Sequence, residues 1–248
     1  MKWTIATALA AILAFSSASG AAEIKVLSTQ ATEQSYRELV PEFERATGNK
    51  VSTIFTGTLD ADKRLASGET YDLLIMSSPS IDQHIKDGIL VPGSRIDIAR
   101  SGVGVAVKKG APKPDIRSVD ALKRTLIGAR SIGYSTGPSG NIVMRLFQKL
   151  GVLDQIKSKL VQTPTSIFVG SIIASGEAEI GFQQVSELSQ FQGIDYVGPL
   201  PADIQEYTTF SSGVVKSGKE QDAVRALVKF LTAPESETAF RKRGMEPG

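Results

Sequence analysis

The chain has 248 residues, with 28 Lys and Arg against 26 Asp and Glu, so its formal net charge at pH 7 is +2. This near balance argues against nucleic acid as a partner. The chain contains no cysteine and one histidine, which excludes disulfides, a lipoprotein anchor and the usual zinc sites. Asp60, Asp62 and Asp72 lack the spacing of a calcium loop, so we expect neither a metal nor a cofactor.

The N-terminal segment has the pattern of a cleaved signal peptide. Lys2 is followed by an apolar run over residues 5–15, which is too short to span a bilayer, and then by small residues at 19–22. We therefore predict a signal peptide over residues 1–22, export to the periplasm and no stable membrane insertion, with a retained anchor as the alternative. Its removal would leave a net charge of +1.

The following part of the chain alternates strand and helix patterns. Strands are predicted over 24–27, 50–55 and 71–76, and each is followed by a helical pattern that ends at a glycine. Pro41 lies within the first helical pattern, where we expect it to kink or shorten the helix. Such alternation predicts a mainly parallel sheet with ligands bound beyond the carboxyl ends of its strands. The candidate ligand-binding residues with polar side chains in these loops are Thr29, Gln30, Thr58 and Ser77.

A second set of elements follows the strand pattern of residues 102–108 and the proline-rich stretch 110–114, which we interpret as the passage into a second lobe. The remaining patterns predict helices at 118–129, 141–151 and 168–175, strands at 131–134, 159–162, 179–182 and 208–215, and C-terminal helices over 220–243. The sequence thus predicts an α/β protein in which residues 23–100 plus 206–248 form lobe 1 and residues 101–205 form lobe 2.

The segment Ser135–Asn141 carries the strongest functional pattern. It connects a predicted strand to a predicted helix, and free amides at a helix N-terminus attract anions. Ser135, Thr136, Ser139 and Gly140 are therefore predicted to bind an anion, and an ordinary capped turn is the alternative. Residues 133–137 also match the Gly-x-Ser-x-Gly motif of serine hydrolases. His84 precedes that serine, however, whereas a hydrolase triad needs a later histidine.

Two glutamines, Gln183 and Gln184, follow the predicted strand at 179–182. Their amides could donate to a ligand oxygen or cap a turn, and the sequence does not decide between these roles.

The order of these elements resembles that of the periplasmic molybdate-binding-protein family, the class II solute-binding proteins of ABC importers. The similarity covers essentially the whole mature chain and includes the stretches at residues 24–27, 43–44, 47–48, 71–75, 138–140, 148–151 and 176–182. It implies a two-lobed class II periplasmic-binding-protein fold, in which each lobe has a mixed, mainly parallel sheet flanked by helices and the ligand cleft lies between the lobes.

The resemblance also implies where a ligand binds. Molybdate binders hold the oxyanion with serines after the first two strands, with amides of the other lobe and with a late tyrosine. The matching positions here are Ala31 beside Gln30, Gly57 or Thr58, the amides of 138–140 and of Phe168 and Val169, and Gln184. Because hydroxyls are missing and a glutamine replaces the tyrosine, we expect a small organic carboxylate rather than molybdate.

Two functions follow from this resemblance. The first is a monomeric binding protein that captures a small anion for an ABC permease. The alternative is the activity of the branch that contains bacterial aconitate isomerase, a cofactor-free 1,3-proton shift between trans- and cis-aconitate in the same cleft. That reaction requires a base, which the sequence does not identify.

Overall fold

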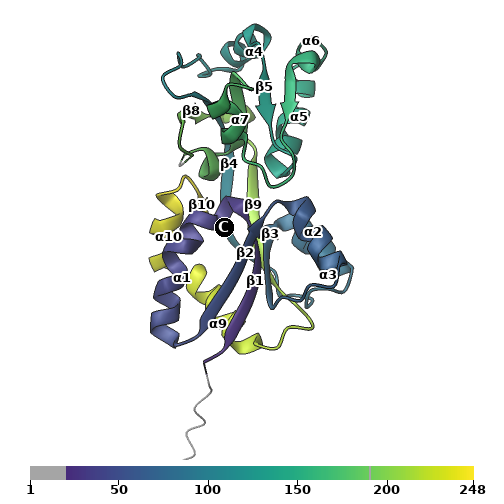
Figure 1. Cartoon of the computed structure of the whole chain (residues 1–248), viewed down its shortest axis with the longest axis vertical. Helices are drawn as coiled ribbons and strands as arrows, with labels where there is room; N and C mark the ends of the chain where they lie inside the picture. The colour runs from purple at the N-terminus through teal and green to yellow at the C-terminus, as the bar shows by residue number, and fades with distance from the viewer. Residues whose placement is uncertain (1–20, 190) are drawn as a thin grey trace, which may run out of the picture.

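The computed structural model describes residues 21–189 and 191–248, so most of the predicted signal peptide lies outside the described residues. The described chain forms two lobes stacked along the long axis of the molecule (Figure 1). The strands β4 (Ile96–Lys108) and β9 (Tyr207–Val214) lie where the lobes meet.

Lobe 1 combines the first three strand–helix units with the C-terminal elements. Its strands, besides part of β4 and β9, are β1 (Glu23–Thr29), β2 (Lys50–Thr56), β3 (Leu73–Ser77) and β10 (Glu246–Pro247). Its helices are the short η1 (Gln30–Thr32), α1 (Glu33–Thr47), α2 (Thr58–Ala66), α3 (Ser78–Lys86), α9 (Gln221–Leu231) and α10 (Pro234–Arg241).

Lobe 2 is built from the middle of the chain. Its strands, besides the second part of β4, are β5 (Ile132–Tyr134), β6 (Leu160–Gln162), β7 (Ile180–Gln184) and β8 (Ile194–Pro199). Its helices are α4 (Val119–Gly128), α5 (Pro138–Lys149), α6 (Leu153–Ile156), η2 (Lys157–Lys159), α7 (Val169–Ser175), α8 (Val185–Leu188) and η3 (Ala202–Ile204).

Strand pairing runs continuously through both lobes in the order β2-β1-β3-β9-β4-β7-β5-β6. β1 is parallel to β2 and β3, and β5 is parallel to β6 and β7, whereas β9 and β4 pair antiparallel with their neighbours. Within β4, residues 96–102 pair with β9, and residues 103–107 pair with β7. The chain therefore enters lobe 2 inside β4, ahead of the proline-rich stretch at 110–114 that the sequence suggested as the passage.

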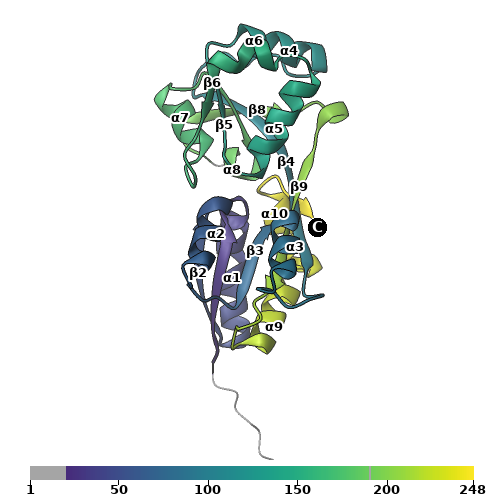
Figure 2. The same ribbon diagram turned by 90° about the vertical axis from the view of Figure 1, so that its right-hand side faces the viewer.

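Each sheet is covered by helices on both faces, as buried parallel strands require. Successive side chains of a strand point to opposite faces. In β1, Val26 packs in the core beneath α1, α9 and α10, while Leu27 packs in the core beneath α2 and α3. In lobe 2, one core lies against α4 and α5 and the other against α7 and α8. The views in Figures 1 and 2 show these layers and the level at which the lobes meet.

The structure corrects several predicted element bounds. α1 continues through Pro41 to Thr47, so the proline does not shorten it. α5 begins at Pro138, a favoured residue at a first helical position, so Ser139 and Gly140 belong to its first turn. Gln183 and Gln184 are the last residues of β7 rather than part of a following loop, and β8 had no counterpart in the sequence prediction.

Candidate functional site

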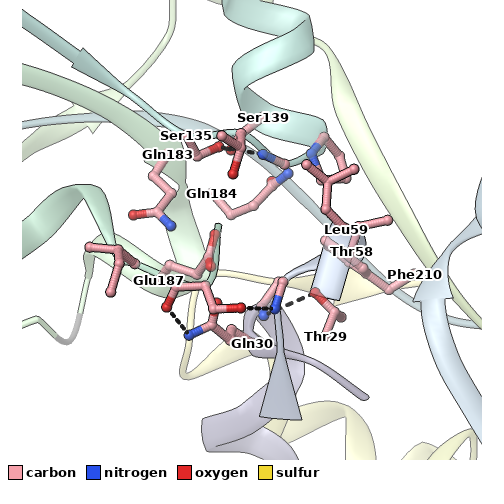
Figure 3. Close-up of a pocket in the computed structure, with 17 residues that line it drawn as sticks. Thr29, Gln30, Thr58, Leu59, Ser135, Ser139, Gln183, Gln184, Glu187 and Phe210 are labelled. Carbon is pink, nitrogen blue, oxygen red and sulfur yellow. Dashed lines mark hydrogen bonds between the residues drawn. The ribbon is translucent and has the colours of Figure 1, made fainter. Parts of the chain in front are cut away.

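A pocket lies between the lobes, at the ends of β1, β2, β5 and β7 (Figure 3). Both lobes contribute residues to its wall. Lobe 1 supplies Thr29, Gln30, Ala31, Gly57, Thr58, Leu59 and Phe210, and lobe 2 supplies Ser135, Thr136, Gly137, Pro138, Ser139, Ser166, Ile167, Gln183, Gln184 and Glu187. Its polar groups are hydroxyls, amides and one carboxyl group, and no Lys, Arg or His is among the described residues that line it.

Eight of the predicted ligand-binding residues border this pocket. They are Thr29, Gln30, Ala31, Thr58, Ser135, Thr136, Ser139 and Gln184. Ser77, Gly140 and Val169 are not among the lining residues. Ser77 ends β3 and is buried, with its hydroxyl 2.9 Å from that of Ser80.

The first turn of α5 is organised around the hydroxyl of Ser135. The amides of Gly137 and Gly140 donate to its Oγ at 3.3 and 3.2 Å, and the Oγ of Ser139 lies 2.9 Å away. A hydroxyl oxygen has two lone pairs, so with both occupied Ser135 donates its own proton to Ser139. The proton of the Ser139 hydroxyl then remains available to an acceptor in the pocket. Gly140 packs closely against the Ser135 carbonyl, and its amide already donates to the Ser135 hydroxyl.

The amide of Val169 is also engaged. It donates to Oε1 of Gln183 at 2.8 Å in a buried position. The predicted backbone donor at the start of α7 therefore binds a side chain of its own lobe. This bond also fixes the Gln183 side chain, whose amide forms a hydrogen bond with Glu187.

Gln184 ties lobe 2 to the two crossing strands. One of the two orientations of its side-chain amide gives both the oxygen and the nitrogen a hydrogen-bond partner. In that orientation the oxygen accepts from the Thr208 hydroxyl at 2.8 Å. Its nitrogen then donates to the carbonyls of Ser101 at 2.9 Å and Gly102 at 3.2 Å. The amide that the resemblance assigned to the ligand thus binds β4 and β9 at the junction of the lobes.

Glu187 is a pocket residue that the sequence analysis missed. It lies on α8, below Gln183 and Gln184 and above Gln30 in Figure 3. Loss of solvation raises the pKa of its carboxyl group to about 8, and the charge of Glu33 adds to this rise. Hydrogen bonds to the backbone of Gln184 and the side chain of Gln183 act in the opposite direction. A single glutamate after a strand resembles a solvated residue, so no local pattern marked it.

The pocket also has apolar walls. Leu59 at the start of α2 and Ile167 before α7 come from opposite lobes, and their side chains are 50% and 46% exposed. Phe210 of β9 contributes a fully buried ring to the same wall. A ligand with a carbon skeleton would contact these groups while its oxygens meet the hydroxyls and amides.

The loop between β6 and α7 bridges the two lobes. The Ser166 hydroxyl donates to Asp60 at 2.6 Å, accepts from the Gly57 amide at 2.9 Å and lies 3.0 Å from the Thr56 hydroxyl. The Gln30 side chain donates to the Ser166 carbonyl at 3.1 Å. The hydrogen bond from Ser166 is the largest cause of a lowered pKa at Asp60. This loop therefore holds the lobes together beside the pocket.

The described residues offer neither a metal-binding cluster nor a membrane-spanning helix. Within residues 21–189 and 191–248, no group of three or more His, Cys, Asp or Glu is arranged to hold a metal ion. No helix in that part of the chain is long and apolar enough to cross a membrane.

The chain is similar to known solute-binding proteins over most of its length. Residues 24–246 match the family model for bacterial extracellular solute-binding proteins. An aconitate isomerase from Pseudomonas sp. is 34% identical over 90% of this chain and 87% of its own. The molybdate-binding protein ModA of Azotobacter vinelandii is 27% identical over 92% of this chain and 91% of its own.

A solved structure shows the same fold. The periplasmic molybdate-binding protein of Azotobacter vinelandii superposes with a TM-score of 0.77 at 20% identity, covering 91% of this chain and 99% of that one. The two-lobed fold predicted from the sequence is confirmed by this similarity. With the family model matched over nearly the whole described chain, the protein belongs to the bacterial extracellular solute-binding proteins.

Proposed function

We propose that the protein binds a small organic carboxylate in the pocket between its lobes and delivers it to an ABC importer in the periplasm. The observation that carries this proposal is the mixed wall of the pocket. Hydroxyl and amide groups such as those of Ser139 and Thr58 suit carboxylate oxygens, and Leu59, Ile167 and Phe210 suit the carbon chain between them.

The carboxyl group of Glu187 makes a compact inorganic dianion a poorer ligand. In its ionised form this group would repel molybdate. In its protonated form it could donate a hydrogen bond to a single molybdate oxygen. An elongated carboxylate can accept that proton at one end while its other oxygens lie near the start of α5. The ligand is therefore proposed to carry at least two carboxylates on a short carbon chain.

A second candidate is an isomerase acting on aconitate in the same pocket. It is favoured by the identity of 34% to a relative with that activity and by the presence of a titratable carboxyl group among the pocket residues. Both candidates require a small organic acid with more than one carboxylate to bind between the lobes.

The experiment is a calorimetric titration of the mature chain with trans-aconitate, the saturated analogue tricarballylate, sulfate and molybdate. We expect micromolar or tighter binding of a carboxylate, and a ligand at 100 times its Kd should add about 2.7 kcal/mol of stability. Tight binding of molybdate with no binding of either tricarboxylate would contradict the proposal.

A further inference from the structure

We propose that Glu187 is the group that moves a proton on the bound carboxylate, removing it from one carbon and returning it to another. This inference rests on the proposed binding of a carboxylate between the lobes and deepens it by naming the chemistry of the pocket.

The position of Glu187 is determined by the elements that meet at the pocket. It lies on α8, directly after β7, and borders two adjoining cavities between the lobes. The backbone of Gln184 and the side chain of Gln183 form hydrogen bonds with its carboxyl group. Gln183 is itself held by the amide of Val169 at 2.8 Å. The carboxyl group is therefore held by groups of its own lobe in the wall of the pocket.

The charges around Glu187 favour a group that exchanges protons near neutral pH. Among the described residues that line these two cavities, the other carboxyl group is that of Glu33 on α1, and no cationic side chain is present. Loss of solvation and, to a smaller extent, the charge of Glu33 disfavour the ionised form, which is why the pKa rises to about 8. At pH 7 about a tenth of the molecules carry the ionised base, and the remainder carry the acid.

The proton transfer is balanced without any other reactant. In trans-aconitate a methylene carbon is adjacent to a carbon–carbon double bond. Ionised Glu187 takes a proton from that methylene, and the electrons of the broken C–H bond form the new double bond. The electrons of the old double bond place negative charge on the former vinyl carbon and its carboxylate. Glu187 returns the proton to this carbon and becomes ionised again.

The other pocket groups have roles that fit this step. The anionic intermediate carries its additional charge on a carboxylate, where hydroxyl donors such as Ser139 stabilise it. Leu59 and Ile167 cover the carbon chain from opposite lobes, which limits the access of water. A purely binding role for Glu187 would require only the protonated carboxyl group.

The test uses the mature chain in heavy water with trans-aconitate, followed by NMR for deuterium uptake and cis-acid formation. We expect the parent protein to exchange and convert, and Glu187→Gln to lose at least about 100-fold in rate, the smaller end of the effect of a general base. Binding of tricarballylate to Glu187→Gln at pH 7 should stay within a few-fold of the parent. Gln34, which lines one of the same cavities, supplies the matched control: Gln34→Ala should retain exchange.

The pH profile separates proton transfer from a structural role. We expect kcat/KM to rise with pH toward a plateau above about pH 8, because the free protein must carry the ionised base. Tricarballylate binding should weaken over the same range, because the ionised carboxylate repels the anion. Glu187→Gln should remove the pH dependence of binding, and Glu187→Asp should restore part of the exchange.

Three results would each contradict a different claim: the identity of the base, the proton transfer or the binding function. Exchange in Glu187→Gln at the parent rate would reject Glu187 as the base. Tricarboxylate binding by the parent without any exchange would reject the proton transfer and retain the binding function. Tight binding of molybdate by the parent, with no binding of either tricarboxylate, would reject the proposed function itself.

Discussion

The hydroxyl of Ser135 links the sequence pattern of the anion-binding loop to its chemistry. It accepts from two amides of the first turn of α5 and directs its proton to Ser139. Ser139 is therefore the residue through which this turn can donate to a ligand. The roles of Ser135 and Gly140 are structural, because both are engaged within the turn.

Replacement of Ser139 by alanine should weaken carboxylate binding by about 10- to 100-fold, the effect of losing a hydrogen bond to a charged group. Stability should fall by about 1 kcal/mol, since the Ser135 hydroxyl loses its acceptor. Calorimetric titration and thermal unfolding measure the two effects. Ser78→Ala is the control, because Ser78 is a buried serine at the start of α3 outside the pocket. Parent affinity in Ser139→Ala would contradict the assignment.

Gly140 should not tolerate even a methyl group. A Cβ atom built at this position would lie 1.8 Å from the Ser135 carbonyl oxygen, so the turn would have to move. We expect Gly140→Ala to lower stability by about 1–3 kcal/mol and to weaken binding through the displaced Ser135. Gly128→Ala, at the end of α4 with open space around it, should be neutral or stabilising. Equal melting temperatures for the two variants would contradict this argument.

At the scale of elements, the loop between β6 and α7 determines how closely the lobes approach. In Figure 2 this loop extends from lobe 2 toward α2 of lobe 1. Its residue Ser166 has a φ of 61°, an uncommon backbone conformation for a residue other than glycine. A side chain at Gly57 would place its Cβ 2.9 Å from the Ser166 amide nitrogen, so glycine permits the contact. The loop and the start of α2 thus fit together only when the lobes are close.

Ser166→Ala should shift the protein toward a more open arrangement and weaken ligand binding by about tenfold. The substitution removes a hydroxyl that bonds to Asp60 and to the Gly57 amide, and affinity falls with the fraction of closed molecules. Small-angle X-ray scattering should give a larger radius of gyration. Ser175→Ala, at the far end of α7, is the control. An unchanged scattering profile together with parent affinity would show that the contact does not hold the lobes.

At the scale of the whole molecule, the lobes are joined where β4 and β9 cross between them. Gln184 binds the carbonyls of β4 and the Thr208 hydroxyl of β9 at this level. The Gln205 side chain accepts from the Val103 amide at 3.0 Å and donates to the Val103 carbonyl at 3.0 Å, replacing a strand partner. We propose that residues 101–103 and 205–207 form the hinge, and the lobe boundaries at 100 and 206 remain predictions.

Gln205→Ala should destabilise the protein by about 1–3 kcal/mol, because the buried Val103 amide loses its acceptor. Gln205→Glu is the matched comparison, because it keeps the acceptor for the Val103 amide and loses the donor to the Val103 carbonyl. Hydrogen exchange at Val103, measured by NMR with and without ligand, should be faster in Gln205→Ala. Protection equal to that of the parent would indicate that the hinge does not depend on this side chain.

The sequence by itself determined the types of most elements, the two-lobed fold and the serine- and glycine-rich turn at the start of α5. These features depend on local periodicity, on glycine stops and on residues that favour a helix N-terminus, all of which are read over a few neighbouring positions. The family resemblance then indicated a cleft between lobes. Eight of the eleven candidate residues border the pocket that the structure describes.

The tertiary structure alone decided which polar groups remain available and which titratable group borders the pocket. The Val169 amide and the Gln184 side chain are engaged by partners distant in sequence, which no local pattern reveals. Glu187 acquires its raised pKa from loss of solvation and from the charge of Glu33 on α1 of the other lobe. Ser166 contacts Asp60, 106 positions earlier in the chain. Solvation and long-range contacts depend on the packing of whole elements, so they become visible only when both lobes are in place.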